Sequence, residues 1–153
     1  MVYSKNSLFV RQWAMVRAAK TFCSRYTALC RQSLAPLGLT AAQSEILLYL
    51  YQRPCETMEN RELLNLLQIT PASLSNTLKE LEQKGFIRCS AHGREKRVSL
   101  TIRALEIHGR LTNQLVELEA VAYYQVTESE RNNAQSTLEK IVRNLSDYSE
   151  KIL

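Results

Sequence analysis

The chain has 153 residues, which is enough for one domain with a hydrophobic core and too few for two comfortable ones. Its content of 45% hydrophobic and 23% charged residues excludes a globally disordered protein. The net charge of +5 suits a polyanionic partner, although many proteins that bind no polyanion carry a similar charge. Only four glycines and three prolines interrupt the chain, which favours helix over sheet.

The sequence shows no segment for membrane insertion or export. Its longest apolar run, residues 46–51, is far shorter than the roughly 20 residues that a membrane span needs. The opening residues, MVYSKNSLFV, lack the apolar region of a signal peptide. We therefore expect a soluble, cytoplasmic protein with no membrane contact. Its four cysteines lack the CxxC spacing of a zinc site, and the default for each is a reduced thiol.

Two helices are predicted in the first part of the chain. Apolar residues recur at steps of three and four over residues 9–30, which predicts an amphipathic helix that ends near Pro36. The segment Thr40–Gln43 (TAAQ) then has the pattern of a capping box, in which two side chains satisfy backbone N–H groups at a helix start. The dense apolar run of residues 46–51 predicts a buried helix that stops before Pro54.

A short helix and a second, capped helix are predicted next. Residues 60–67 (NRELLNLL) form the first of them. Thr70 is a good N-cap for the second, and Pro71 fits its first position, where a backbone N–H has no partner. The buried stripe of this helix is Leu74, Leu78 and Leu81. Gly85 is suited to the position just after its end.

Two long helices are predicted near the C-terminus. Thr101 can cap the first, and residues 127–130 (TESE) form a second capping box that starts the last helix. The inward positions of the first are Leu105, His108, Leu111, Leu115, Leu118 and Ala122. The apolar stripe of the last is Leu138, Ile141, Val142, Leu145, Tyr148 and Ile152. Striped end helices have few partners in so short a chain, which favours packing against a second copy in a two-fold dimer.

The helix from Thr70 has a surface suited to a DNA groove. The side opposite its leucine stripe and the flanks of that side carry small and polar residues, which we predict to contact DNA: Ala72, Ser73, Ser75, Asn76 and Lys79. Small side chains allow close approach, Ser and Asn can bond base edges, and a helix N-terminus attracts phosphate. Together with the short helix before it, this helix forms a helix-turn-helix whose second helix enters the major groove. One such helix is usually plain solvated surface, so the prediction depends on the whole series of elements.

A hairpin adds a second candidate contact. Two strands, residues 86–89 and 96–100, are joined by a predicted loop over residues 90–95 with a glycine in its turn. Cationic side chains and a histidine gather at or near the tip: His92, Arg94, Lys96 and Arg97. Arg94 is expected to reach the minor groove, and Lys96 and Arg97 to hold phosphate.

The predicted elements give a mostly α-helical fold with a small β-hairpin. We interpret residues 1–153 as a single domain. Within it, residues 40–101 form a winged helix-turn-helix unit that binds DNA. The flanking helices, over residues 1–36 and 102–153, are interpreted as dimerisation helices.

Three stretches carry a family resemblance: LGLTAAQSEILLYL, ELLNLLQITPASLSNTLKELEQKGFIR and GREKRVSLT. From about Leu8 to its end, the chain resembles the MarR family of bacterial winged-helix regulators. The resemblance implies a homodimer on a pseudo-palindromic, double-stranded operator, with recognition helices in successive major grooves and wings in flanking minor grooves. It also implies repression by occlusion of a promoter, with activation as the alternative. Release would follow binding of a small, often aromatic ligand or, in some members, thiol oxidation.

The sequence departs from the family pattern at positions near the DNA. The usual Asp-x-Arg of the wing is His92-Gly93-Arg94, which keeps the arginine. Asn76 and Glu80 stand where members commonly have arginine. These departures bear on the operator sequence and on the strength of DNA binding, and they leave the fold unaffected. A protein-interaction module with degraded DNA specificity is therefore one alternative function.

Other side chains suggest other roles. Cys23 and Cys30 share a helix face, and a thiol-redox-responsive regulator of the same fold is a second alternative, with ordinary core cysteines as the simpler explanation. In the layout of the family, an effector pocket could include Trp13, Arg25, Tyr26 and His108, which could equally be packing residues. No metal-ligand spacing and no common catalytic motif is present. We expect no metal, no cofactor and no enzymatic activity.

Overall fold

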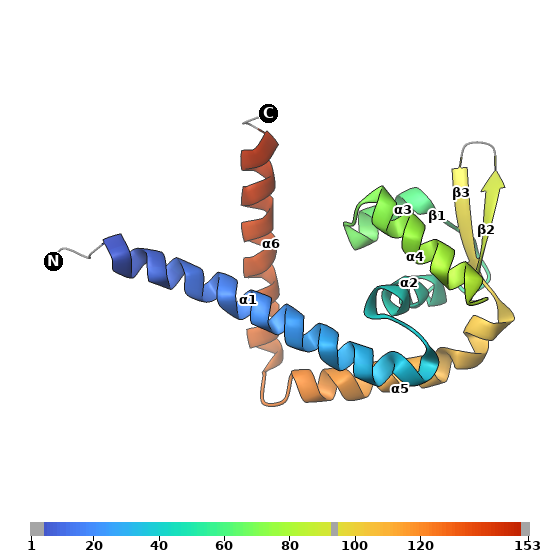
Figure 1. Ribbon diagram of the computed structural model, residues 1–153, viewed down its shortest axis with the longest axis horizontal. Coiled ribbons are helices and arrows are strands. Elements are labelled where there is room, and N and C mark those ends of the chain that lie inside the picture. The colour runs from blue at the N-terminus through green and yellow to red at the C-terminus, as the bar shows by residue number, and fades with distance from the viewer. Residues whose placement is uncertain (1–4, 93–94, 151–153) are drawn as a thin grey trace. The chain divides into compact units, whose positions relative to one another are not determined.

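The computed structural model describes residues 5–92 and 95–150 (Figure 1). The chain divides into two compact units, Met1–Leu118 and Glu119–Leu153. The first holds the helix-turn-helix, the hairpin and the long helix that precedes them. The second holds the last helix and the end of the helix before it.

The first unit begins with the long helix that the apolar period predicts, α1 (Lys5–Leu34). A short 3-10 turn, η1 (Ala35–Leu37), follows it. Gly38 then has a φ of 66°, in the left-handed region that glycine enters without strain. Cys30 and Leu34 are buried, so the C-terminal end of α1 belongs to the core.

Helix α2 (Ala41–Tyr51) is buried along most of its length. Thr40 and Gln43 form the predicted capping box: each backbone N–H donates to the other side chain at 3.2 Å. The buried residues of α2 are Gln43, Ser44, Ile46, Leu47 and Leu50. A glutamine side chain is tolerated in such a place only when its amide is hydrogen-bonded, as it is here.

Helices α3 (Asn60–Leu67) and α4 (Pro71–Gln83) form the predicted helix-turn-helix. The turn between them places Gln68 at a φ of 51°, in the left-handed region. Thr70 caps α4 by accepting a backbone N–H of its first turn at 3.2 Å. The buried residues of α4 are the predicted Leu74, Leu78 and Leu81. Gly85, with a φ of 76°, follows its end as predicted.

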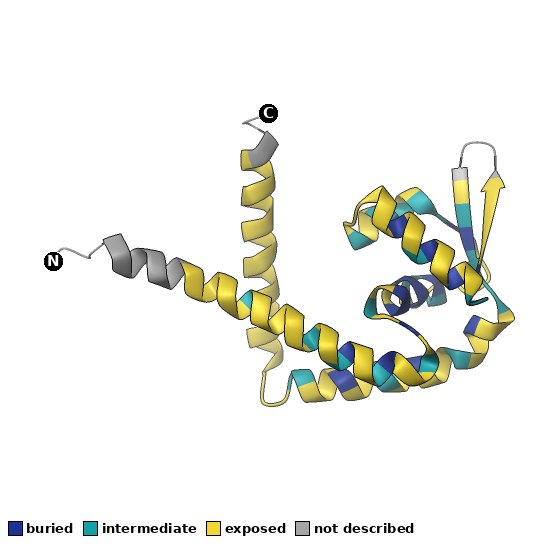
Figure 2. Cartoon of the chain, viewed as in Figure 1, coloured by how far each residue is buried: buried dark blue, intermediate teal, exposed yellow. Residues whose placement is uncertain are grey.

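The hairpin belongs to a three-stranded antiparallel sheet with the order β1-β3-β2. The short strand β1 (Met58–Glu59) pairs with β3 and was not predicted, because two residues carry no periodic signal. Strands β2 (Ile87–His92) and β3 (Glu95–Leu100) form the hairpin itself. Met58, Ile87 and Val98 are buried beneath the helices, so one face of the sheet closes the core of the first unit (Figure 2).

The predicted loop over residues 90–95 is wrong. The ladder extends into both ends of this segment, with Ser90 opposite Arg97 and Ala91 opposite Lys96, up to the pair formed by positions 92 and 95. The polar composition of this segment is typical of a loop. In a hairpin that extends beyond the core, however, neither face is buried, so polar residues are compatible with strand.

Helix α5 (Ile102–Ala122) starts at the predicted cap, where Thr101 Oγ1 accepts the N–H of Ala104 at 3.4 Å. Its buried residues are Ala104, Leu111 and Leu118. Two predicted inward positions are wrong for the single chain, since Leu105 is 44% exposed and His108 is exposed as well. In the first turns of α5, the predicted inward positions lie one residue C-terminal to the buried ones. The reason is that Ala104 is too small to stand out in an apolar pattern.

The second unit consists of the last residues of α5 and the whole of α6 (Glu128–Glu150). Thr127 and Glu130 form the predicted capping box: the Thr127 N–H donates to the carboxylate at 2.9 Å, and the Glu130 N–H donates to Thr127 Oγ1 at 3.2 Å. Hydrogen bonds from Thr127 lower the pKa of the Glu130 carboxyl. The predicted stripe of α6 is exposed within the chain at Leu138, Ile141, Val142, Leu145 and Tyr148, and Ile152 lies outside the described residues.

Candidate nucleic-acid interface

The outward side of α4 is exposed (Figure 2), and its residues are small or polar. All the residues predicted for the major groove are exposed: Ala72, Ser73, Ser75, Asn76 and Lys79. The first turn of α4 carries no acidic side chain, so nothing there offsets the positive end of the helix dipole. Thr70 Oγ1 donates to Ser73 Oγ at 3.1 Å, which makes Ser73 part of the cap as well as of the surface.

A hydrogen-bond network joins α4 to the start of α2 through the fully buried Gln43. Gln43 Nε2 donates to Glu80 Oε2 at 2.7 Å. Lys84 Nζ donates to Gln43 Oε1 at 2.7 Å and to the carbonyl oxygen of Gly38 at 2.8 Å. The sequence signals only the capping role of Gln43, because a contact across 37 positions leaves no local pattern.

The two strand cations predicted for the wing lie on opposite faces of β3, since side chains alternate along a strand. Lys96 is exposed and shares its face with Val98, which is buried nearer the core. Arg97 lies on the other face, where its guanidinium is 3.3 Å from the carboxylate of Glu59 on β1. The two cations therefore do not form one patch, and only Arg97 has an acidic neighbour across the sheet.

The base of the wing is attached to the end of α4. Glu82 Oε1 accepts the backbone N–H of Cys89 at 2.7 Å, which occupies a donor on the outer edge of β2. Arg94, predicted for the minor groove, lies outside the described residues. His92 is described only by its backbone, as the last residue of β2.

A family model described as the MarR family matches residues 39–99. That range runs from Leu39, the residue before the capping box of α2, to the penultimate residue of β3, so the helix-turn-helix and the strands of the wing are matched together. Over these residues the chain matches the MarR family. No protein with a curated description matches it.

Three solved structures share the fold of this chain. A cysteine-to-serine mutant of MarR from E. coli, in complex with operator DNA, has a TM-score of 0.74 at 22% identity, over 88% of this chain and 97% of that one. MepR from S. aureus, in a DNA complex, has a TM-score of 0.72 at 22% identity, over 94% of this chain and 99% of that one. A MarR transcriptional regulator from Methanosarcina mazei has a TM-score of 0.70 at 16% identity, over 88% of this chain and 90% of that one. The predicted fold class, a winged helix-turn-helix, is confirmed.

The thiols of the chain differ in their surroundings. Cys23 is exposed and Cys30 is buried, about 10 Å apart along α1, which is beyond the reach of a disulfide. Burial raises the pKa of Cys30, although a hydrogen bond with Tyr26 opposes it. Burial and the neighbouring Glu82 raise the pKa of Cys89 as well. Raised values disfavour the thiolate that oxidation requires.

The four residues considered for an effector pocket are dispersed. Trp13 and Tyr26 both lie on α1, about 20 Å apart along its axis, so one small ligand does not span them within a chain. Trp13 and Arg25 are exposed, and Tyr26 stacks on a phenylalanine one turn earlier. His108 instead packs against Tyr51, with ring centroids 4.2 Å apart.

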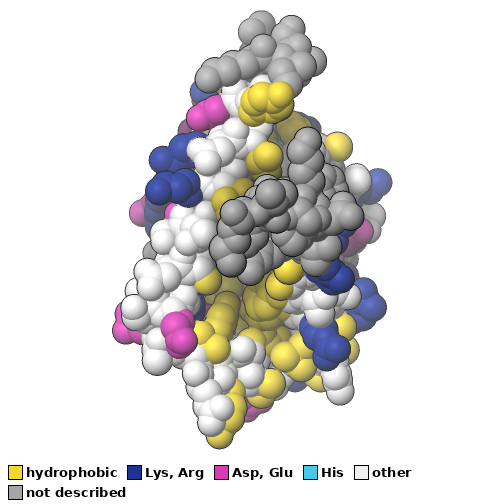
Figure 3. Space-filling model, turned by 90° about the vertical axis from the view of Figure 1, so that its left-hand side faces the viewer, with side chains coloured by type: hydrophobic (Ala, Val, Ile, Leu, Met, Phe, Trp, Pro, Cys, Tyr) yellow, Lys and Arg dark blue, Asp and Glu magenta, His cyan; other side chains and the backbone are white. Residues whose placement is uncertain are grey.

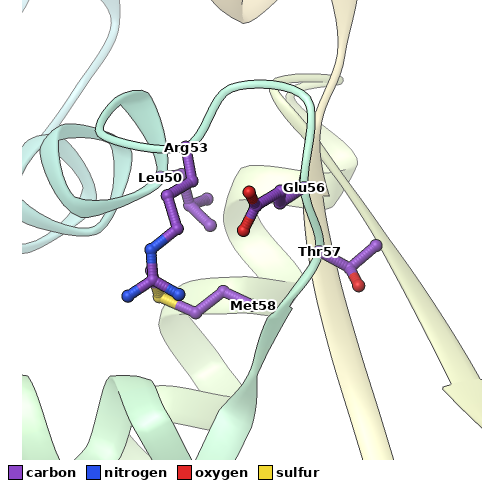
Figure 4. Close-up of a pocket in the computed structure, with 5 residues that line it drawn as sticks. All are labelled: Leu50, Arg53, Glu56, Thr57 and Met58. Atoms are coloured by element: carbon purple, nitrogen blue, oxygen red, sulfur yellow. The ribbon is translucent and has the colours of Figure 1, made fainter.

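A shallow hollow lies where α2 ends and β1 begins (Figure 4). It is lined by Leu50, Arg53, Glu56, Thr57 and Met58, none of which was predicted for a site. It is too tight to admit a water molecule, and therefore too tight for an effector.

Within residues 5–92 and 95–150, no cluster of histidine, cysteine and acidic side chains is arranged to hold a metal ion. Among the helices in the described part of the chain, none has an apolar stretch long enough to cross a bilayer.

Proposed function

We propose that this protein is a homodimeric, sequence-specific regulator of transcription of the MarR family, which binds double-stranded DNA. The observation that carries the proposal is the exposed polar side of α4, on a helix that is capped by Thr70 and has no acid in its first turn. Such a helix end presents backbone N–H groups to phosphate, and its next turns are free to reach base edges.

In this proposal α4 enters the major groove. Ala72 and Ser73 are small enough to let the first turn approach the DNA backbone closely. Ser75 and Asn76, which follow, bond base edges, and Lys79 contacts phosphate or a guanine edge. All of these side chains are exposed on one helix whose leucines hold it against the core.

The hairpin supplies the second contact. We assign Arg94 to the minor groove, with His92 near it in sequence, and Lys96 and Arg97 to phosphate. Because the carboxylate of Glu59 lies 3.3 Å from Arg97, we expect Lys96 to contribute more to phosphate binding than Arg97 does.

The fold comparison supports a role on DNA. The MarR mutant from E. coli and MepR from S. aureus were both solved in complex with DNA, and both cover nearly all of their own length in the superposition. A chain with the same fold and with a polar, exposed α4 is suited to the same use.

Homodimer formation is supported by large apolar side chains that one chain leaves exposed. On α1 they are Trp13, Met15, Val16 and Phe22, and on α6 they are the stripe residues from Leu138 to Tyr148. Figure 3 shows apolar side chains, in yellow, open to solvent. Apolar surface of this kind marks protein–protein interfaces. Light scattering on a sizing column should give twice the mass of one chain.

We further propose repression by occupation of promoter DNA, with release by a small, often aromatic ligand; the support for this step is the family resemblance. A ligand releases the protein only if it binds the DNA-incompetent form more tightly than the competent one. Transcription in vitro from the protein's own promoter should fall when the protein is added. A rise would identify an activator.

The test of DNA binding is a titration of the protein against its own upstream intergenic duplex and a scrambled duplex, at two salt concentrations. We expect tight binding to the upstream duplex with one dimer per site, and weaker, more salt-sensitive binding to the scrambled one. Equal binding to both that vanishes with salt would reject sequence-specific regulation.

A further inference from the structure

Gln43 is the buried centre of the network that joins α2 to α4. Its side-chain amide has one acceptor and one donor group, and the network uses both. The oxygen accepts from Lys84 at 2.7 Å and from the Thr40 N–H at 3.2 Å. The nitrogen donates to Glu80 at 2.7 Å. One neutral side chain thus contacts a cation and an anion that both belong to the C-terminal end of α4.

The bonded residues share a side of α4 with the proposed base reader. Asn76, Glu80 and Lys84 are four residues apart in turn, and residues at this spacing lie above one another on a helix surface. A rotation of α4 that broke the bond to Glu80 would therefore also redirect Asn76. The buried leucines of α4 fix which side of the helix faces the core. Buried hydrogen bonds depend on distance and angle and therefore set the rotation of the helix more finely.

We propose that Gln43 is a positioning residue for the recognition helix. Through Glu80 and Lys84 it fixes the rotation of α4 about its axis, and with it the direction of Asn76 and Lys79 toward the DNA. Gln43 itself is fully buried, so its side chain is not available for contact with DNA. The inference rests on the proposed function, since it assigns α4 to base readout.

The chemistry of the amide predicts which substitutions fail. With Gln43→Glu, the new carboxylate still accepts from Lys84 but repels Glu80. With Glu80→Gln added, the amide and the carboxylate have exchanged places, and the bond between the two positions can form again in the opposite direction. Gln52→Glu is the matched control, because it makes the same change at the exposed C-terminal end of α2.

The experiment is a double-mutant cycle on the ratio of affinities for a selected duplex and a scrambled one. We expect Gln43→Glu to lower this ratio about tenfold, the scale of one lost base contact. In the Glu80→Gln background, Gln43→Glu should change this ratio little. Gln52→Glu should change it little both in the wild-type background and in the Glu80→Gln background. A purely structural role for Gln43 would instead reduce binding to both duplexes by one common factor. An equal loss of ratio in both backgrounds would also overturn the inference.

Amide hydrogen exchange on the DNA-free protein decides the inference independently of any DNA. We expect Gln43→Glu to accelerate exchange in the second half of α4 by about tenfold or more, and the double variant to restore protection. If the wild-type chain shows no duplex preference, the proposed function fails. Even then, unchanged exchange in Gln43→Glu would show that Gln43 does not hold α4.

Discussion

The phenolic oxygen of Tyr51, at the end of α2, donates a 2.6 Å hydrogen bond to the carbonyl oxygen of Ala104 in the first turn of α5. The ring of His108, one turn further along α5, packs on the same tyrosine. Burial raises the pKa of Tyr51 to about 12. This pair fastens the winged unit to the helix that leaves it.

Tyr51→Phe removes the hydroxyl and keeps the ring. We expect the free energy of unfolding to fall by about 0.5–1.5 kcal/mol, the usual net contribution of one hydrogen bond. Urea denaturation at neutral pH measures it. An unchanged midpoint would mean that water replaces the hydroxyl at Ala104 without loss.

The same tyrosine predicts a dependence on alkaline pH. Its folded pKa, about 12, is above the ordinary value of 10.0, so the folded state holds the proton more tightly. The stabilisation is complete below pH 10 and is lost as the pH rises through about 12. The wild type should therefore lose more thermal stability over this interval than Tyr51→Phe does. Parallel melting curves for the two proteins would contradict the burial of Tyr51.

Asn76→Ala tests base readout by α4. We expect a loss of preference at particular base pairs of the operator, of about 1–3 kcal/mol each, because a side chain that bonds base edges discriminates at the positions it touches. Competition titrations with single base-pair variants measure it. Equal losses on every duplex would remove Asn76 from base readout.

Lys96→Ala and Arg97→Ala separate the two faces of the wing. We expect Lys96→Ala to reduce the slope of log affinity against log salt by about one unit, because one phosphate contact is lost. Arg97→Ala should change the slope less, since Glu59 is its neighbour. Titrations at several salt concentrations measure both slopes. The reverse order would show that Arg97 leaves Glu59 when DNA binds.

Alkylation tests the prediction that Cys30 is a core cysteine. We expect it to react more slowly than the exposed Cys55, because it is buried and its pKa is raised. Peptide mapping by mass spectrometry after timed exposure to iodoacetamide gives the rate at each thiol. Equal rates would reopen the thiol-responsive alternative.

The parts of the fold that the sequence predicted are those with local signals. Thr40 and Thr127 begin capping boxes four residues long, the stripe of Leu74, Leu78 and Leu81 has a helical period, and Gly85 follows a helix end. Each of these patterns lies within a short stretch of sequence.

The parts that the sequence did not predict depend on contacts between distant segments. Strand β1 exists because Met58 pairs with Val98, and Glu80 is held by Gln43 from another helix. Every residue predicted for the exposed side of α4 is exposed, because the three buried leucines determine which side of the helix faces away from the core. The acidic neighbour of Arg97 could not be predicted, because it comes from the strand that carried no signal.

The most direct measurement of the central claim is selection of duplexes from a random pool by the purified protein, followed by sequencing. A dimer that places two copies of α4 in successive major grooves should enrich a palindromic motif whose half-sites are about 10 base pairs apart, centre to centre. The motif should be enriched at moderate salt, where non-specific binding is weak. A pool that remains random after repeated rounds would contradict sequence-specific DNA binding by this chain.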